Sequence, residues 1–428
     1  MLRGGSLNRR SFVHTSATAA ATLAFARSAA ANRANNKLVA AVMGTNGRGS
    51  ALARSFLALE NTEVAYICDP EDGALAKGMK AVADKQNNTP DGVKDFRRAL
   101  DDQGVDLLIC AAPNHWHAPA TILACSQGKH VYVEKPCSHN PWEGEMMVAA
   151  ARKHGRSVQI GTQRRSSPGT RLAMERLRSG AIGKPYLARA YYNNSRGSIG
   201  QGKTVAVPEW LDYELWQGPA PRRPYLDNVV HYNWHWRWHW GNGELGNNGV
   251  HTLDLCRWGL GVTYPTQVTS TGGRYVYQDD QETPDTHTVG FTFPDECAIT
   301  WQGLSCNRHG EKFVEFYGTE GTIELDSNGN FRLYDRHDKL QEQVDDSRLG
   351  EADHVANFLQ AVRGNRPDGL HAEILEGHRS TLLCHLGNIA QRVGRALTCD
   401  PQNGSILHDE EAVGHWKREY AEGWEPAV

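Results

Sequence analysis

Between residues 37 and 160 the sequence alternates short apolar runs with longer stretches of helical spacing. Strands that alternate with helices form a doubly wound parallel sheet, because each crossover helix packs against a face of the sheet. We therefore predict an α/β Rossmann domain over residues 37–160. Its strands are expected at residues 37–43, 64–68, 105–110, 131–133 and 157–160, and its helices at residues 50–59, 72–83, 95–100, from about 115, and 141–153.

The first predicted strand ends in a glycine-rich turn, Gly44-Thr45-Asn46-Gly47-Arg48-Gly49. Between a strand and a helix, such a turn offers the free amides of the helix N-terminus to a pyrophosphate. The middle glycine of the G-x-G-x-x-G pattern is Asn46 here, but the adjacent Gly47 can supply the close backbone approach. Taken alone, the turn is also consistent with an ordinary tight βα loop. The candidate nucleotide-binding residues are Gly44, Asn46, Gly47, Arg48 and Gly49.

An acidic residue, Asp69, follows the second predicted strand and lies 20 residues beyond Gly49. A carboxylate at this place accepts hydrogen bonds from the adenosine ribose hydroxyls and repels a 2′-phosphate. Asp69 therefore supports a nucleotide site at the turn and favours NAD over NADP.

The strand at residues 131–133 leads into Glu134-Lys135-Pro136. Ligands of a doubly wound sheet bind outside the carboxyl ends of its strands, so Lys135 is placed to reach a substrate. Burial lowers the preference of a lysine for its charged form, which suits a proton carrier. The alternative is a surface Glu-Lys pair after an edge strand.

A second polar group follows the strand at residues 105–110. Pro113 ends this strand, and Asn114 is expected to cap a helix that begins near His115. His117 either faces the nicotinamide or lies at the domain surface. We count Asn114, His117, Glu134 and Lys135 among the candidate cofactor residues.

Downstream of residue 160 the pattern changes to runs of strand-like segments separated by turns. This pattern favours a largely antiparallel sheet, and hence an α+β second domain over residues 161–428. Helices are expected at residues 167–179, 353–362 and 372–393, and strands at residues 186–192, 267–277, 287–293, 298–301, 312–317 and 322–325.

Residues 231–240 are unusually rich in tryptophan and histidine, with four tryptophans in seven residues. Aromatic faces commonly line pockets of carbohydrate size, although a core aromatic cluster under a loop is the alternative. The histidines recur at positions 231, 235 and 239, so a metal site must be considered. Interleaved tryptophans and the lack of a supporting acid argue against it, and we predict no metal. Tyr232, His235 and Trp236 are candidate substrate residues.

The segment from Gly246 to Arg257 resembles a turn that enters a helix. Asn247, His251 and Asp254 are then expected on one face, at i, i+4 and i+7. An imidazole on that face is a reasonable general base for a sugar hydroxyl, and capping or packing of the helix start is the alternative.

The N-terminus carries Asn8-Arg9-Arg10-Ser11-Phe12-Val13, a mild apolar run at residues 17–26, and small residues up to Ala31. This layout predicts a twin-arginine export signal over residues 1–31 and a periplasmic or otherwise exported protein. A disordered basic N-terminus is the alternative. Ten weakly apolar residues are too few to span a bilayer.

Loss of residues 1–31 lowers the formal net charge from −3 to about −7, so nucleic acid and anionic membrane surfaces are poor partners. The nine cysteines are scattered and include no C-x-x-C pair. Neither a zinc cluster nor a dense disulfide framework is indicated.

The glycine-rich turn, Asp69, Glu134-Lys135-Pro136 and Gly249-Val250-His251-x-x-Asp254 occur in an order and spacing that resemble the Gfo/Idh/MocA oxidoreductases, from about residue 37 to residue 395. The resemblance implies an N-terminal Rossmann domain that binds NAD(P), and a C-terminal domain whose open sheet supplies the sugar pocket and often an oligomer interface. It also implies that Lys135 is the catalytic lysine and that His251 shares proton transfer. We count Arg164 among the candidate substrate residues and expect a homodimer or homotetramer.

One position departs from the family pattern, because Asn247 stands where the family usually has an aspartate four residues before the histidine. An amide can orient the substrate or His251 but cannot act as a base. Two phrases, residues 216–219 and 232–236, are similar to a branch of the family with twin-arginine signals.

These observations favour an exported NAD-dependent oxidoreductase that acts on a sugar, cyclitol or glycoside. Since no free NAD pool regenerates an exported enzyme, a tightly bound cofactor should cycle within each turnover. One alternative is a glycoside-cleaving enzyme that oxidises, eliminates and reduces. Another is a non-catalytic, nucleotide-containing binding protein, which the amide at Asn247 would suit.

Overall fold

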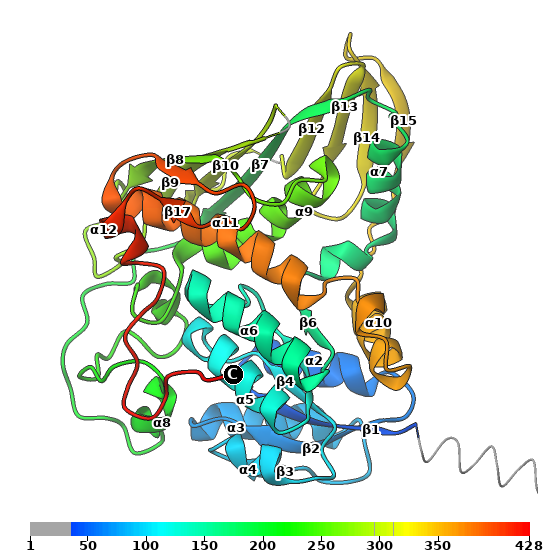
Figure 1. Ribbon diagram of the computed structural model, residues 1–428. Coiled ribbons are helices and arrows are strands. Elements are labelled where there is room, and N and C mark those ends of the chain that lie inside the picture. The colour runs from blue at the N-terminus through cyan, green and yellow to red at the C-terminus, as the bar shows by residue number, and fades with distance from the viewer. Residues whose placement is uncertain (1–35, 295, 311) are drawn as a thin grey trace, which may run out of the picture.

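A computed structural model describes residues 36–294, 296–310 and 312–428 of the chain. The chain forms two layered units, with the first sheet and its helices below and a larger, splayed sheet above (Figure 1). The predicted export signal lies outside the described residues. Within the described residues, no helix combines the length and apolar character that a membrane span requires.

The first unit is built on a six-stranded sheet with the order β3-β2-β1-β4-β5-β6, in which every neighbouring pair is parallel. This order is that of the Rossmann fold, so the predicted doubly wound sheet is confirmed. The strands are β1 (Leu38–Met43), β2 (Thr62–Cys68), β3 (Asp91–Val93), β4 (Leu107–Cys110), β5 (His130–Val133) and β6 (Val158–Ile160). The helices are α2 (Arg48–Leu57), α3 (Asp72–Ala83), α4 (Arg97–Asp101), α5 (Asn114–Ser126) and α6 (Pro141–His154).

Both faces of this sheet are buried. Successive residues of β1 alternate between the faces, so that Val42 joins the core formed with α2 and α3, whereas Met43 joins the core formed with α5 and α6. A helix from the far end of the sequence, α10 (Glu351–Arg363), completes the first core. Its Phe358 ring lies 6.1 Å from Phe56 and 5.8 Å from Tyr132. Although α10 lies within residues 161–428, it packs on the Rossmann sheet.

One local prediction is wrong at the start of α5. Asn114 is the first residue of the helix and does not cap it; Pro113 precedes it, with no side-chain cap. The Asn114 amide instead donates from Nδ2 to Asn242 Oδ1 at 3.0 Å. Because the Asn114 side chain bonds to Asn242, it does not cap its own helix.

The second unit is an eleven-stranded sheet, antiparallel except for the pair β7–β10, which confirms the predicted α+β class. Its central order is β15-β14-β13-β12-β7-β10-β9-β8-β16-β17, and β11 pairs with β7. The strands are β7 (Pro185–Ser195), β8 (Gln267–Gly273), β9 (Thr286–Phe293), β10 (Cys297–Leu304), β11 (Cys306–Asn307), β12 (Val314–Gly318), β13 (Gly321–Leu325), β14 (Phe331–Asp335), β15 (Leu340–Val344), β16 (Leu397–Cys399) and β17 (Ile406–Leu407).

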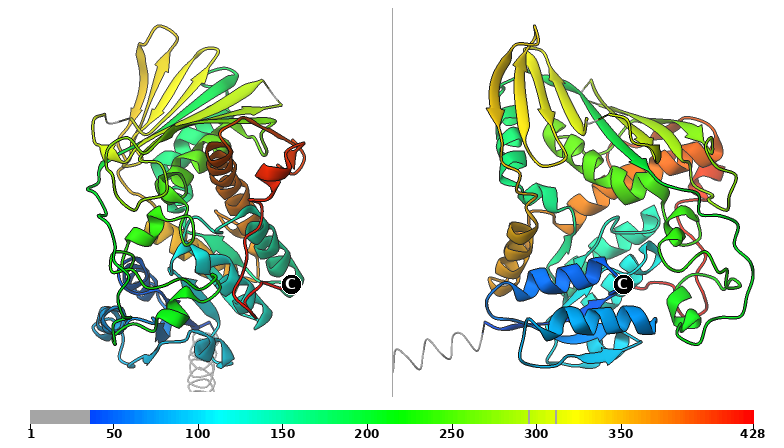
Figure 2. Two further views of the ribbon diagram at one scale, coloured as in Figure 1. Left: turned by 90° about the vertical axis from the view of Figure 1, so that its left-hand side faces the viewer. Right: turned by 180° about the vertical axis from the view of Figure 1, so that it is seen from behind.

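Helices α7 (Pro168–Arg178), α9 (Val250–Leu260) and α11 (Ile374–Val393) lie between this sheet and the Rossmann unit (Figures 1 and 2). Strand β9 shows why one face of the sheet is buried. His287, Val289, Phe291 and Phe293 are buried at alternate positions, while Thr288 and Thr292 are exposed. The apolar face therefore packs on the helices.

A long connecting segment, residues 196–244, runs from β7 back toward the Rossmann unit and includes α8 (Tyr213–Gln217) and the 3₁₀ turn η2 (Asn233–Trp236) (Figure 2). It docks beside the end of β2, where the Asp72 amide donates to Trp210 O and the Asp212 amide donates to Pro70 O, both at 3.0 Å. The segment has its own aromatic core, in which Trp216 and Trp240 meet at 5.4 Å. The second unit thereby covers the carboxyl ends of the parallel strands.

Candidate active site

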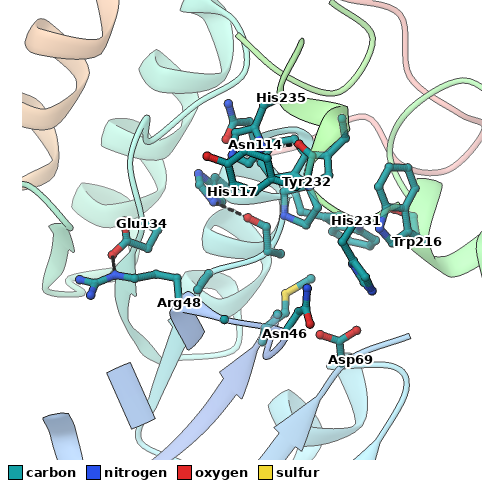
Figure 3. A pocket seen from close by; sticks show the side chains of 18 of the residues that line it. Asn46, Arg48, Asp69, Asn114, His117, Glu134, Trp216, His231, Tyr232 and His235 are labelled. Atoms are coloured by element: carbon teal, nitrogen blue, oxygen red, sulfur yellow. Dashed lines mark hydrogen bonds and ion pairs between the residues drawn. The ribbon is translucent and has the colours of Figure 1, made fainter. Parts of the chain in front are cut away.

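A cavity of about 560 Å³ lies where the connecting segment covers the carboxyl ends of β1, β2, β4 and β5 (Figure 3). It is large enough for a nucleotide end and a small ligand. The predicted residues that line it are Gly44, Asn46, Gly47, Arg48, Asp69, Asn114, His117, Glu134, Lys135, Tyr232, His235, Asn247 and His251. Gly49, Arg164 and Trp236 do not line it.

The glycine-rich turn has the close approaches that require glycine. Gly44 has φ +83°, and a Cβ there would lie 2.5 Å from Ala112 N. A Cβ on Gly49 would lie 2.0 Å from Gly44 O, so Gly49 supports the turn from behind rather than lining the cavity. At Gly47, a Cβ would have no protein atom within 4 Å. The N-terminus of α2 has no side-chain cap, and its amides are available to a pyrophosphate. The turn therefore fits a dinucleotide.

Asp69 lies at the end of β2 and is held by two backbone amides. It accepts hydrogen bonds from Thr45 N at 2.7 Å and from Glu71 N at 3.1 Å. Burial raises the pKa of Asp69, and these two hydrogen bonds act in the opposite direction. Nearby, His231 Nε2 lies 3.2 Å from Glu71 Oε2. This end of the cavity presents a fixed carboxyl group where the adenosine ribose of a dinucleotide would lie.

Arg48 and Glu134 form an ion pair across the cavity floor (Figure 3). Arg48 donates from Nε to Glu134 Oε1 and from Nη1 to Glu351 Oε2, both at 2.6 Å. The other Glu134 oxygen accepts from the Lys135 amide at 3.2 Å. The arginine cation holds the pKa of Glu134 below its usual range against the opposing effect of burial. Glu134 is therefore a fixed negative charge beside Lys135.

Lys135 joins the two units at the centre of the cavity. Its Nζ donates to the Asn247 carbonyl at 2.7 Å and to Asn247 Oδ1 at 3.1 Å. Burial lowers the pKa of Lys135, and the Glu134 carboxylate partly offsets this effect. The amine is thus positioned by an amide, and its basicity is set by a neighbouring carboxylate.

His251 lines the same region of the cavity. Its Nδ1 is buried and has no hydrogen-bond partner among residues 36–294, 296–310 and 312–428. Burial, with a smaller effect of the Lys135 cation, holds the pKa of His251 well below its usual range. The ring is neutral and can exchange a proton with a bound hydroxyl group.

Asp254 does not line the cavity beside Asn247 and His251. Asp254 forms a buried, bidentate ion pair with Arg165, with Nε–Oδ2 at 2.8 Å, and accepts from Ser380 Oγ at 2.6 Å. Asn247 belongs to a π-helical turn, η3 (Leu245–Gly249), before α9 begins. A π turn contains more residues than an α turn, so α-helical spacing does not apply between Asn247 and α9.

His117 and Asn114 line the cavity and are buried, so His117 does not lie at the domain surface. The two ring nitrogens of His117 contact Pro136 O at 2.6 Å and Ala112 O at 2.7 Å. His117 therefore ties the start of α5 to the chain that follows Lys135. The histidine is fixed in place by the backbone on both sides.

The aromatic segment forms the roof of the cavity. His235 Nδ1 lies 2.6 Å from Tyr232 O, and its ring stacks on Trp234 at 3.5 Å. Burial lowers the pKa of His235 to about 3. Trp236, by contrast, is only 2% exposed and packs beneath the Arg196 guanidinium at 4.7 Å.

The three histidines considered for a metal contact different groups. His231 contacts Glu71, His235 contacts the Tyr232 carbonyl, and His239 contacts the Pro221 carbonyl. Among the residues that the structure describes, no three His, Cys, Asp or Glu side chains are grouped to hold a metal ion.

Arg164 does not line the cavity and is engaged elsewhere. Its Nη1 donates to Ser327 O at 2.6 Å, and its guanidinium lies 4.4 Å from the Phe313 ring centre. Arg196 also lines the cavity, and it was not predicted from the sequence. Arg196 donates from Nε to Glu244 Oε2 at 2.8 Å and from Nη1 to the Tyr232 hydroxyl at 3.1 Å.

The Rossmann sheet, the glycine-rich turn and the lysine in the cleft define a dinucleotide-dependent oxidoreductase. Family comparison agrees over most of the chain. Residues 38–162 match the oxidoreductase family, NAD-binding Rossmann fold, and residues 194–425 match its C-terminal alpha/beta domain. The chain belongs to the Gfo/Idh/MocA oxidoreductase family.

The related proteins carry different names. An inositol 2-dehydrogenase of Salmonella paratyphi B is 29% identical over 181 residues, 42% of this chain and 52% of that protein. A glycosyl hydrolase family 109 protein of Saccharopolyspora erythraea is 26% identical over 200 residues, 44% of this chain and 43% of that protein. Each alignment thus spans about half of the relative or less. A solved structure of levoglucosan dehydrogenase with NADH and levoglucosan has a TM-score of 0.67 at 17% identity and covers 85% of this chain and 99% of that chain.

Proposed function

We propose that this protein oxidises a hydroxyl group of a sugar, cyclitol or glycoside with NAD as the hydride acceptor. The observation that carries the proposal is the Lys135 amine, which Asn247 holds at the meeting point of the two units in a cavity with room for both ligands. When bound, the nicotinamide ring supplies the acceptor for the hydride that leaves the carbinol carbon.

Lys135 takes the hydroxyl proton as the carbonyl forms. Its lowered pKa increases the fraction of unprotonated amine near neutral pH. The adjacent Glu134 carboxylate stabilises the ammonium that results, so the proton gained by Lys135 is not isolated in an apolar site. Asn247 orients the amine and carries no proton itself.

His251 shares the transfer through its imidazole ring, which lines the cavity. A neutral imidazole can accept a hydrogen bond from a substrate hydroxyl in one tautomer and donate one in the other. We assign it the second contact to the reacting or neighbouring hydroxyl. This pairing of Lys135 and His251 leaves no step that needs an aspartate at position 247.

A polyhydroxylated substrate suits the roof of the cavity. Tyr232, Trp234 and His235 supply aromatic surface, and Arg196 supplies hydrogen-bond donors beside Tyr232. Two related proteins are named for inositol and levoglucosan, which supports a substrate of this class. Asp69 favours NAD over NADP.

The twin-arginine pattern supports export of the folded protein with its nucleotide, and the open second sheet supports a homodimer or homotetramer. The export rests on the sequence pattern, and the oligomer rests on the family resemblance. An exported enzyme would retain its NAD and return it to the starting redox state in each cycle.

The test is turnover of a panel of sugars, cyclitols and glycosides by the wild type and by Lys135→Met, which keeps the side-chain length and removes the amine. We expect the variant to bind NADH but to lose at least about 100-fold in kcat, the range that general acid–base catalysis supplies. Lys153→Met, on an exposed lysine without a hydrogen-bond or ion-pair partner among the described residues, is the control. Equal turnover by wild type and Lys135→Met would overturn the proposal.

A second candidate is net glycoside cleavage, which similarity to the family 109 glycosyl hydrolase favours. Oxidation to a ketone would acidify the neighbouring C–H, the glycosidic group would leave by elimination, and water addition with re-reduction would complete hydrolysis. Release of the aglycone without net change in NAD would distinguish this route from simple dehydrogenation.

A further inference from the structure

A second cavity, of about 590 Å³, lies on the other side of the aromatic segment. It is bounded by the start of α6, by α11, by residues 221–223 and 238–242, and by the chain after α12 (Glu410–Val413). Its charged lining is almost entirely basic. Five cations line it, Arg222, Arg223, Arg392, Lys417 and Arg418, against a single carboxylate, Glu419.

Asn242 separates the two cavities. Its Oδ1 accepts from Asn114 Nδ2, which belongs to the first cavity, and its Nδ2 donates to His139 O at 2.9 Å. The basic cavity is therefore a separate chamber and not an extension of the dinucleotide cleft.

Arg222 and Lys417 pair with Glu214 and Glu425, whereas other cations of the cavity keep donors that the protein does not use. The guanidinium groups of Arg223 and Arg392 have no hydrogen-bond or ion-pair partner among the described residues, and Arg392 only lies over the Trp238 ring at 5.2 Å. Arg418 uses Nε and Nη2 for Glu143 and His115 O, but its Nη1 is buried without a partner in the described part of the chain. Unpaired guanidinium groups in one cavity repel one another, and an anion would relieve the repulsion.

Together with burial, the positive charge of these arginines lowers the pKa of two neighbouring histidines. Burial and then the Arg223 cation lower the pKa of His239 to about 4, and burial and then Arg392 lower the pKa of His415. Helix α6 begins at Pro141 and is 14 residues long, so its positive dipole end adds to the field at this cavity.

One side chain of the lining, His139, can accept a hydrogen bond rather than donate one. His139 Nε2 lies 3.0 Å from the Trp238 carbonyl, which requires the proton on Nε2, because a carbonyl can only accept. Burial holds the pKa of His139 well below its usual range, so the ring is neutral and its buried, partnerless Nδ1 is an acceptor. An acceptor beside arginines suits a ligand that carries hydroxyl groups as well as negative charge.

We propose that the basic cavity binds an anionic sugar, with its carboxylate or phosphate on Arg223, Arg392 and Arg418 and a hydroxyl group on His139 Nδ1. A volume of about 590 Å³ accommodates a ligand of sugar phosphate size. The site does not require the dinucleotide, so it is independent of the proposed redox chemistry.

The experiment is calorimetric titration of the full chain with glucuronate, glucose 6-phosphate, inorganic phosphate and uncharged glucose, with and without saturating NADH. NADH fills the pyrophosphate site at α2, so binding that persists in its presence belongs elsewhere. The variants are Arg223→Ala and Arg392→Met, the second of which keeps an apolar stem over Trp238. Arg178→Ala removes an exposed arginine of α7 that is unpaired among the described residues and serves as the control.

We expect at least one sugar anion to bind with NADH present, and each cavity variant to weaken that binding by about tenfold, as loss of one charge-assisted hydrogen bond predicts. Preference for glucuronate or for glucose 6-phosphate identifies the anionic group. The proposal is overturned if neither sugar anion binds, if both cavity variants bind as the control does, or if glucose or inorganic phosphate binds as well as the sugar anions.

Discussion

Two opposing influences set the basicity of Lys135. Burial lowers the pKa of the amine and the Glu134 carboxylate raises it, and the net effect is a pKa below the ordinary value of 10.5. Since the unprotonated amine takes the hydroxyl proton, kcat/KM for oxidation should rise with pH and level off below pH 10.5. His251 should add no step near pH 6.5, because its ring stays neutral well below that value.

Glu134→Gln tests this balance. Removal of the carboxylate takes away the interaction that raises the Lys135 pKa, so the midpoint of the rising limb should move to lower pH by about one unit. The pH profile of kcat/KM measures the shift, with Glu60→Gln on an exposed loop as the control. A midpoint that moves upward would contradict the assigned charge interaction.

We propose that Asp69, at the other end of the cavity, governs the choice between NAD and NADP. Asp69→Ala removes the carboxyl group that would contact the ribose hydroxyls and repel a 2′-phosphate. We expect the preference for NADH over NADPH to fall by about tenfold or more, measured as a ratio of dissociation constants by nucleotide fluorescence. Unchanged selectivity would rule out this role.

The positions of the site residues along the chain explain which of them could be predicted from the sequence. Lys135 and Asp69 directly follow strands of a parallel sheet, so their place at its carboxyl edge follows from the sequence pattern. Arg196 and Glu244 are 48 residues apart and meet only when the connecting segment folds, and no local pattern marks their ion pair. Arg164 was misplaced because chain position after β6 does not determine side-chain direction.

Among the elements, the turn before α2 depends most on a close contact between backbone atoms. Gly49→Ala would place a methyl group 2.0 Å from Gly44 O and force the turn to move. We expect the free energy of unfolding to fall by about 1–3 kcal/mol, the range of overpacked sites, and NADH binding to weaken in parallel. Chemical denaturation and NADH titration measure both effects. Gly369→Ala, where the nearest atom would lie 4.0 Å away, should match the wild type, and an equally stable Gly49→Ala protein would contradict the steric argument.

Elements with strong periodicity were predicted well, and polar or irregular ones were not. Helix α3 has the predicted bounds, Asp72–Ala83. Strand β15 has the sequence Leu-Gln-Glu-Gln-Val at the sheet edge and lacks the alternation that marks a half-buried strand. The π turn η3 was missed because nothing in Leu245–Gly249 distinguishes it from a helix start.

At the scale of the whole molecule, the connecting segment covers both ends of the cavity. His231 lies by Glu71 at one end, and His235 lies near Lys135 at the other. A nucleotide beneath this cover would leave slowly. If the protein is exported with its cofactor, protein isolated from its native location and then denatured should release close to one NAD or NADH per chain, measured by chromatography. Nucleotide-free protein would contradict retention, while binding of added NAD would leave the redox proposal standing.

The central claim is direct transfer of hydride between a carbinol carbon and a nicotinamide in this cavity. The most direct measurement uses NAD-loaded protein and a substrate deuterated at its reacting carbinol carbon, stopped within one turnover, with mass analysis of the released nucleotide. We predict one deuterium in the reduced nucleotide for the wild type and almost none for Lys135→Met, whether the overall reaction is oxidation or glycoside cleavage. Reduced nucleotide without deuterium, or substrate conversion with no label transfer at all, would contradict the claim.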